Sequence, residues 1–131
     1  MSVALLFITH EGIASSLLNI GKAIIQSPIN NLSSIEVPMD ADTESVAQDI
    51  ENKLAQLSRD DGVLFITDIF GSTPSNVAQK IAGKYEADLI SGVNLPMVIR
   101  LLNYRNENKQ TLIQKALTCA KQGIQLNNSE S

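Results

Sequence analysis

A chain of 131 residues with a formal net charge of −4 is most simply one domain, long enough to bury about two-thirds of its unfolded surface. Its acidic balance and its lack of a Lys/Arg cluster argue against nucleic-acid binding, and no apolar run approaches the ~20 residues that cross a bilayer. A single cysteine, Cys119, permits no intrachain disulfide and favours a reducing compartment, so we expect a cytoplasmic protein.

The first half of the chain reads as strand, helix, strand, helix. Apolar residues over 3–9 predict a strand, and a helix follows over 13–25. We expect the apolar stripe of that helix to face the core: Ile13, Leu17, Ile20 and Ile24, widened by Leu18 and Ile25. A short strand at 35–37, stopped by Pro38, fits a place near a sheet edge. Polar residues at 40–43 then offer N-caps for a second helix with a regular apolar stripe: Val46, Ile50, Leu54 and Leu57.

The second half begins with the most apolar stretch of the chain. Residues 63–66 form an unbroken apolar run, typical of a central parallel strand covered on both faces, and Asp68 follows it. Thr73 and Pro74 predict the N-cap and the first residue of a third helix that runs to Gly83. The remaining predicted elements are a strand at 87–90, a helix from Pro96, a helix closed by Gly123 and a short strand at 124–126.

Alternation of strands and helices indicates an α/β fold with right-handed crossovers. We expect an open, mainly parallel sheet in the order 2-1-3-4, with helices on both faces. No interior linker interrupts the pattern, so residues 1–126 are predicted as one domain and residues 127–131 as a polar tail.

Two similar strand ends carry the candidate chemistry. The first strand closes with the sequence FITH, ending in His10, and the central strand closes with FITD, ending in Asp68. If these strands are neighbours in a parallel sheet, the two side chains meet at its carboxyl edge, where open α/β sheets bind ligands. We interpret the pair as a histidine nucleophile and the carboxylate that orients it.

A phosphoryl group suits such an exposed nucleophile. Backbone N–H groups and hydroxyls of Gly71, Ser72 and Thr73, at the start of a helix, can cradle phosphate oxygens. Each feature also has an ordinary reading: His10 as a core or surface histidine, Asp68 as a turn residue, and the 71–76 segment as a plain helix cap. The three features together favour the functional reading more than any one does.

Other site motifs are missing from the sequence. Gly21-Lys22 lacks the upstream glycine of a Walker A loop, and neither a GxGxxG nor a GxSxG motif occurs. One histidine and one cysteine, far apart in sequence, do not suggest a zinc site. We therefore expect no metal ion and no cofactor.

Four segments together resemble a known family: residues 3–12 with His10, 62–68 with Asp68, 71–76 (GSTPSN) and 92–97 (GVNLPM). They are similar to the IIA domain of mannose-family (mannose/fructose/sorbose) sugar phosphotransferase systems, and the similarity extends to about residue 126. The resemblance implies that His10 accepts phosphate from the carrier protein HPr and passes it to a IIB protein or domain. It also matches Asp68 to the family's orienting aspartate and Thr73 to its phosphate-side hydroxyl.

The resemblance further implies a homodimer in which the last strand, around residues 124–126, crosses to the partner's sheet as an antiparallel edge strand. Association with a membrane-bound IIC/IID complex is expected, without insertion of this chain into the membrane. We also expect a surface for partner proteins that is made of Phe70, Asn94, Leu95, Pro96 and Met97.

Two positions depart from the family pattern. Glu11 stands between His10 and Gly12, where the family has glycine directly after the histidine, and Ser72 replaces the second glycine of the turn. The charge of Glu11 beside a phosphorylated His10 is expected to disfavour the phosphorylated state.

Alternative functions stay open at this point. One is a regulatory module that senses phosphorylation without sugar transport, and a weaker one is the phosphodonor subunit of a dihydroxyacetone kinase. The sequence does not identify the sugar. It also does not say whether IIB is a separate chain, lies in a longer form of this chain or is missing.

Overall fold

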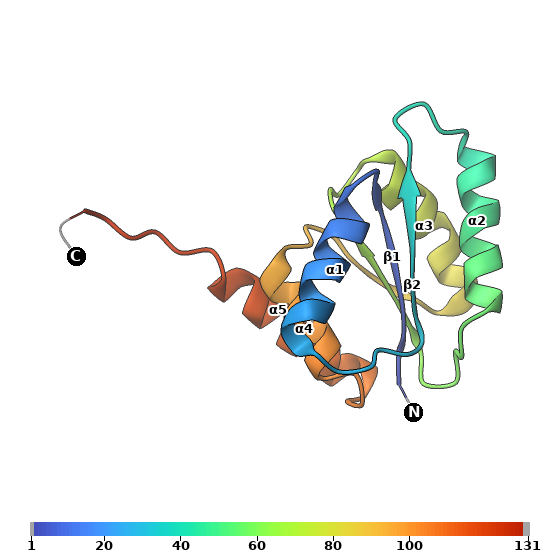
Figure 1. Cartoon of the computed structure of the whole chain (residues 1–131). Helices are drawn as coiled ribbons and strands as arrows, with labels where there is room; N and C mark the ends of the chain where they lie inside the picture. The colour runs from blue at the N-terminus through green and yellow to red at the C-terminus, as the bar shows by residue number, and fades with distance from the viewer. Residues whose placement is uncertain (1, 130–131) are drawn as a thin grey trace.

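The computed structural model describes residues 2–129, and the elements alternate as the sequence predicts (Figure 1). In chain order they are β1 (Ala4–His10), α1 (Ile13–Ile25), β2 (Leu32–Val37), α2 (Thr43–Ala55), β3 (Val63–Thr67), α3 (Thr73–Tyr85), β4 (Asp88–Ile90), α4 (Leu95–Asn103) and α5 (Lys109–Gln122). The strands pair in parallel in the order β2-β1-β3-β4, which confirms the predicted sheet.

Helices cover both faces of this sheet, with α2 and α3 on one side and α1, α4 and α5 on the other (Figure 1). Side chains alternate between the faces along each strand. Leu5 and Phe7 of β1 therefore pack in the core beneath α1, α4 and α5, whereas Leu6 and Ile8 pack beneath α2 and α3. This double burial explains why β1 and β3 lack polar alternation.

Half of the predicted apolar stripe of α1 faces the core: Leu18 is buried, and Leu17 and Ile25 pack against the core. The prediction is wrong for Ile13, Ile20 and Ile24, which are 39%, 48% and 53% exposed, whereas Ala14 and Gly21 are buried. The physical reason is the close approach of α4. A Cβ atom at Gly21 would lie only 3.0 Å from Val98 Cγ1, so the small face of α1 is the one that packs.

The start of α3 also differs by one residue. Ser72, not Thr73, is the N-cap, and Thr73 and Pro74 occupy the first turn. Gly71 has a φ of +86°, a left-handed conformation that glycine adopts without strain, and this places Ser72 in the extended geometry of a cap. At its other end α3 continues past Gly83 to Tyr85.

The predicted last strand is not formed within the described chain. Residues 124–126 have no regular structure, and Ile124 and Leu126 are 79% and 94% exposed. Figure 1 shows this segment running away from the fold after α5. Its exchange with a second copy stays a prediction, and residues 130–131 of the predicted tail lie outside the described residues. Within the described part, no helix combines the length and apolar character needed to span a membrane.

Candidate functional site

His10 and Asp68 meet at the carboxyl edge of the sheet. His10 Nδ1 lies 2.8 Å from Asp68 Oδ2, and the same carboxylate oxygen accepts the backbone N–H of His10 at 3.0 Å. The His10 side chain is 25% exposed and that of Asp68 only 10% exposed. The carboxylate is thus fixed between two groups of one residue, and the ring keeps an open side.

Strand register brings the two residues together. β1 and β3 are direct parallel neighbours, with Ile8 opposite Thr67, so His10 at the end of β1 and Asp68 directly after β3 lie at the same edge of the sheet. Asp68 is then held by the loop after β4, because its carbonyl oxygen accepts the N–H of Gly92 at 3.1 Å. The sequence signal for this contact was the FITH/FITD pair. No sequence pattern pointed to the support from Gly92.

Hydrogen bonds stabilise the charged form of Asp68. Burial raises the pKa of its carboxyl, but the hydrogen bonds that His10 and Ile69 donate to it lower that pKa more. The pKa of Asp68 is therefore below its ordinary value of 3.8, and the group is ionised at neutral pH. An ionised carboxylate can only accept hydrogen bonds, so it holds the Nδ1 proton on the histidine ring.

The N-terminus of α1, directly after His10, already has its own acceptors. Thr9 Oγ1 accepts the N–H of Ala14 at 3.1 Å, and Glu36 Oε2 from β2 accepts the N–H of Ser15 at 2.7 Å. These bonds explain how α1 begins without a side-chain cap at Gly12. The sequence did not predict this role of Glu36, because the contact forms only when β2 pairs with β1. Its carboxylate also opposes a second anion at this helix end.

The N-terminus of α3 is differently arranged. The N-cap residue Ser72 makes no side-chain capping bond, and its hydroxyl donates to the Ile69 carbonyl oxygen at 2.7 Å. Asn76 Nδ2 donates to the Gly71 carbonyl oxygen at 3.1 Å, which keeps the turn closed. The predicted phosphate-side residues Gly71, Ser72 and Thr73 therefore lead into a helix that begins at Thr73, five residues after Asp68. No carboxylate caps this turn in residues 2–129.

The residues expected to face partner proteins differ in how far they are exposed. Phe70 is 75% exposed, and the neighbouring Ile69 is 60% exposed. Asn94 instead caps α4 through the N–H of Met97 and donates to the Ala120 carbonyl oxygen of α5, both at 3.0 Å. The expectation is wrong for Met97, because its side chain is 2% exposed and packs in the core beneath α4. Leu95 and Pro96 are half-buried.

The chemistry of this arrangement is that of a single polarised imidazole. With Nδ1 held by Asp68, the second ring nitrogen, Nε2, is the one left to form a bond with an incoming group. No group of three potential metal-ligating side chains gathers anywhere in residues 2–129. The orientation of the ring by Asp68 fits covalent catalysis by a histidine.

Comparisons with known proteins identify relatives of this chain. The chain is 28% identical over 127 residues to the PTS system mannose-specific EIIAB component of Escherichia coli (strain K12), covering 95% of this chain and 39% of that protein. It thus spans about two-fifths of the length of that relative.

Solved structures show the same architecture. A mannose/sorbose-specific IIA subunit of the phosphotransferase system from Enterococcus faecalis superposes with a TM-score of 0.86 at 19% identity, over 98% of this chain and 96% of that one. A protein from Klebsiella pneumoniae subsp. pneumoniae MGH 78578 has a TM-score of 0.80 at 30% identity, over 99% and 94% of the two chains. Its name assigns it to the phosphoenolpyruvate-dependent sugar phosphotransferase system.

The family assignment rests on a match over most of the length. Residues 4–117 match the EIIA-man family, described as the PTS system fructose IIA component. That range includes both strands of the site, the α3 turn and the α4 cap. The chain therefore belongs to the EIIA-man family of phosphotransferase system IIA components.

Proposed function

We propose that this chain is a phosphocarrier of a sugar phosphotransferase system, in which His10 accepts a phosphoryl group from phospho-HPr and passes it to a IIB protein or domain. Membership of the IIA family supports the transferase class and these two partners. The observation that carries the role of His10 is its 2.8 Å contact with Asp68.

Asp68 prepares His10 for attack. Its ionised carboxylate keeps the proton on Nδ1, which leaves the lone pair on Nε2. As the ring becomes cationic on bond formation, the same carboxylate offsets the developing charge. Asp68 thus orients the nucleophile and stabilises the product without itself changing protonation.

The transfer step exchanges a bond between phosphorus and the donor for one between phosphorus and His10. The Nε2 lone pair of His10 attacks phosphorus, and the bond from phosphorus to the donor atom of HPr breaks with its electron pair returning to that atom. In the second step a nucleophile of IIB attacks the same phosphorus, and the electron pair returns to His10 Nε2. Neither step consumes a cofactor.

The first turn of α3 is the proposed cradle for the phosphoryl oxygens. Alternation along β1 puts His10 on the same face as Leu6 and Ile8, which is the face covered by α2 and α3. The backbone N–H groups of this turn and the Thr73 hydroxyl supply donors, and the helix dipole favours negative charge there. The carboxylate of Glu36 makes the α1 end less suitable.

Ile69 and Phe70 are the proposed contact surface for both protein partners. They follow Asp68 directly in the chain and expose large apolar side chains. Apolar groups exposed next to a reacting centre are typical of docking surfaces. The net charge of −4 suits a partner with a basic surface.

Cytoplasmic location, a homodimer and association with IIC/IID at the membrane are part of the same proposal, since they follow from the family resemblance. The regulatory and dihydroxyacetone-kinase readings are not favoured, because the matching family and the named relatives are sugar phosphotransferase components.

Onward transfer is the test that separates a carrier from a sensor. The phosphorylated chain, freed of HPr, is mixed with IIB from a mannose-family system, and intact mass is followed for both proteins. A carrier loses its phosphoryl group as IIB gains one, and the same mixture without IIB is the control. Retention of the phosphoryl group by a chain that HPr has labelled would refute the carrier role.

A further inference from the structure

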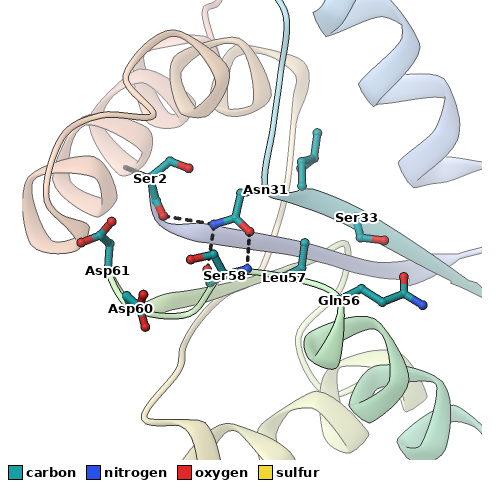
Figure 2. A pocket seen from close by; sticks show the side chains of 9 residues that line it. Ser2, Asn31, Ser33, Gln56, Leu57, Ser58, Asp60 and Asp61 are labelled. Atoms are coloured by element: carbon teal, nitrogen blue, oxygen red, sulfur yellow. Dashed lines mark hydrogen bonds between the residues drawn. The ribbon is translucent and has the colours of Figure 1, made fainter.

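Two cavities of contrasting chemistry lie at the amino edge of the sheet, opposite His10. The larger, of about 530 Å³, includes Asp60 and Asp61 in its lining, together with Ser2 and Asn31 (Figure 2). Asn31 is fully engaged there, because its side chain bonds to the Ser2 carbonyl oxygen and to both backbone polar groups of Ser58. This cavity carries negative charge and offers no cation among its lining residues.

The second cavity, of about 330 Å³, has a buried cation in its wall. Arg105, in the loop between α4 and α5, is only 8% exposed. Its Nη2 donates to the carbonyl oxygen of Val3 at 2.9 Å and to that of Asn31 at 3.0 Å. These two bonds fix the guanidinium against the beginnings of β1 and β2.

Arg105 has no counter-ion in the described chain. No carboxylate of residues 2–129 lies within ion-pair distance of it, and its Nε is buried without a hydrogen-bond partner. Burial alone lowers the pKa of this guanidinium to about 10. A neutral amide could donate to the two carbonyl oxygens with a smaller loss of folding free energy, because burying an unpaired charge is strongly unfavourable.

The rest of this cavity is lined by neutral hydrogen-bonding groups and a few apolar ones. The polar side chains are those of Ser2, Ser27, Asn30, Asn103 and Asn106, and no acidic residue belongs to the lining. Asp61 and Glu107 line another cavity, which shares Ser2 and Asn106 with this one, and Glu107 is paired with Lys115 at 3.1 Å. The carboxyl ends of α1 and α4 also approach here, but they carry only partial charges.

We propose that the cavity between the α1–β2 and α4–α5 loops is a binding site for a small oxyanion, a phosphate or a carboxylate, with Arg105 as its charged partner. The anion supplies the negative charge that no described residue places beside Arg105, and the asparagine amides and serine hydroxyls donate to its oxygens. The site is separate from His10 and does not depend on phosphoryl transfer.

Arginine side-chain NMR signals test this proposal on the unphosphorylated full-length chain. The sequence contains three arginines, Arg59, Arg100 and Arg105, so their Nε–H signals can be resolved and compared. Inorganic phosphate is titrated at constant ionic strength, with acetate in a second arm and chloride in a third. We expect saturable shifts of the Arg105 signal and of the Asn30 and Asn106 amides with phosphate or acetate, and none with chloride.

An isosteric variant supplies the missing carboxylate while keeping Arg105. Asn30→Asp should weaken phosphate binding by about tenfold or more through charge repulsion and competition for the guanidinium. Asn52→Asp, which adds the same charge on exposed α2, should bind phosphate as the wild type does. Asn106→Asp provides a second variant of the same design.

The phosphate and acetate arms separate the two ligand types. Binding of both anions indicates a general oxyanion site, and binding of phosphate alone indicates a tetrahedral one. Absence of a saturable Arg105 shift with either anion, equal shifts of all three arginines, or unchanged binding in Asn30→Asp would overturn the proposal and leave Arg105 as an anchor for two backbone carbonyls.

Discussion

Asp68 Oδ2 receives two hydrogen bonds from His10, one from the ring Nδ1 at 2.8 Å and one from the backbone N–H at 3.0 Å. The backbone bond fixes the carboxylate relative to β1, and the ring bond fixes the imidazole relative to the carboxylate. Both bonds depend on β1 and β3 being parallel neighbours, which brings His10 and Asp68 to the same edge of the sheet. The sheet thereby orients the proposed nucleophile before any substrate arrives.

Asp68→Asn tests whether this carboxylate acts on His10. An amide can occupy the same space and accept from Nδ1, but it cannot offset a ring that becomes cationic. We expect phosphorylation by phospho-HPr to slow by about 10²-fold or more, with the fold preserved. Stopped mixing followed by intact mass gives the rate, and circular dichroism checks the fold. Asp49→Asn, on the exposed face of α2, is the matched control. A wild-type rate in Asp68→Asn would reduce Asp68 to a turn residue.

The lowered pKa of Asp68 predicts how stability depends on pH. Because the folded-state pKa lies below the ordinary value of 3.8, the folded protein binds the proton less tightly than the unfolded chain. The contribution of Asp68 is therefore complete above the unfolded pKa and is lost as pH falls through 3.8 toward the folded pKa.

Urea unfolding between about pH 5 and pH 3 measures this contribution. Wild type should lose stability across that window more steeply than Asp68→Asn, since the difference between the two isolates Asp68 from the other carboxylates. Parallel curves for the two proteins would show that His10 and Ile69 do not perturb this group.

Glu36 is predicted to stabilise α1 from a neighbouring strand. Its carboxylate accepts the Ser15 N–H at 2.7 Å, and hydrogen bonds from Ser15 and Gly12 lower its pKa. Glu36→Ala should lower the free energy of unfolding by about 1 kcal/mol, the usual effect of losing a helix cap. Glu36→Gln keeps an acceptor and should lose less. Equal stability of Glu36→Ala and wild type in urea would exclude the capping role.

Glu11 is predicted to disfavour phosphorylated His10. It is exposed and adjacent in sequence, so its charge opposes the roughly two negative charges of a phosphoryl group. Glu11→Gly should raise the equilibrium fraction phosphorylated at a fixed ratio of phospho-HPr to HPr, more at low salt than at moderate salt. Glu11→Gln removes the charge and keeps the size of the side chain. Glu44→Gln on α2 is the control for removing a charge far from His10. An unchanged fraction at both salt concentrations would make Glu11 an ordinary solvated residue.

The C-terminal segment is predicted to hold a homodimer. Ile124 and Leu126 are 79% and 94% exposed, and a three-residue strand is marginal unless it pairs with a sheet edge. Light scattering should give twice the monomer mass for the full chain, whereas deletion after Gly123 should give monomers or poorly soluble protein. A folded, monodisperse monomer of the full chain would contradict the exchange.

Periodicity and turn residues predicted the α/β alternation, because buried parallel strands leave strong apolar runs. The meeting of His10 with Asp68 was predicted on the condition that their strands are neighbours, which the sheet order fulfils. Periodicity wrongly placed Ile13, Ile20 and Ile24 of α1 in the core, because the burial of the small residues beside them depends on the close approach of α4 to Gly21. Glu36, Gly92 and Arg105 act through contacts between distant segments, and a single sequence holds no signal for those.

The most direct test of the central claim is the intact mass of the chain after incubation with phosphoenolpyruvate, enzyme I and HPr. Wild type should gain one phosphoryl group, and His10→Ala should gain none while remaining folded. Nitrogen chemical shifts of the labelled ring should then place the phosphorus on Nε2. Equal labelling of wild type and His10→Ala would contradict the account, because the phosphoryl group would then reside on another residue.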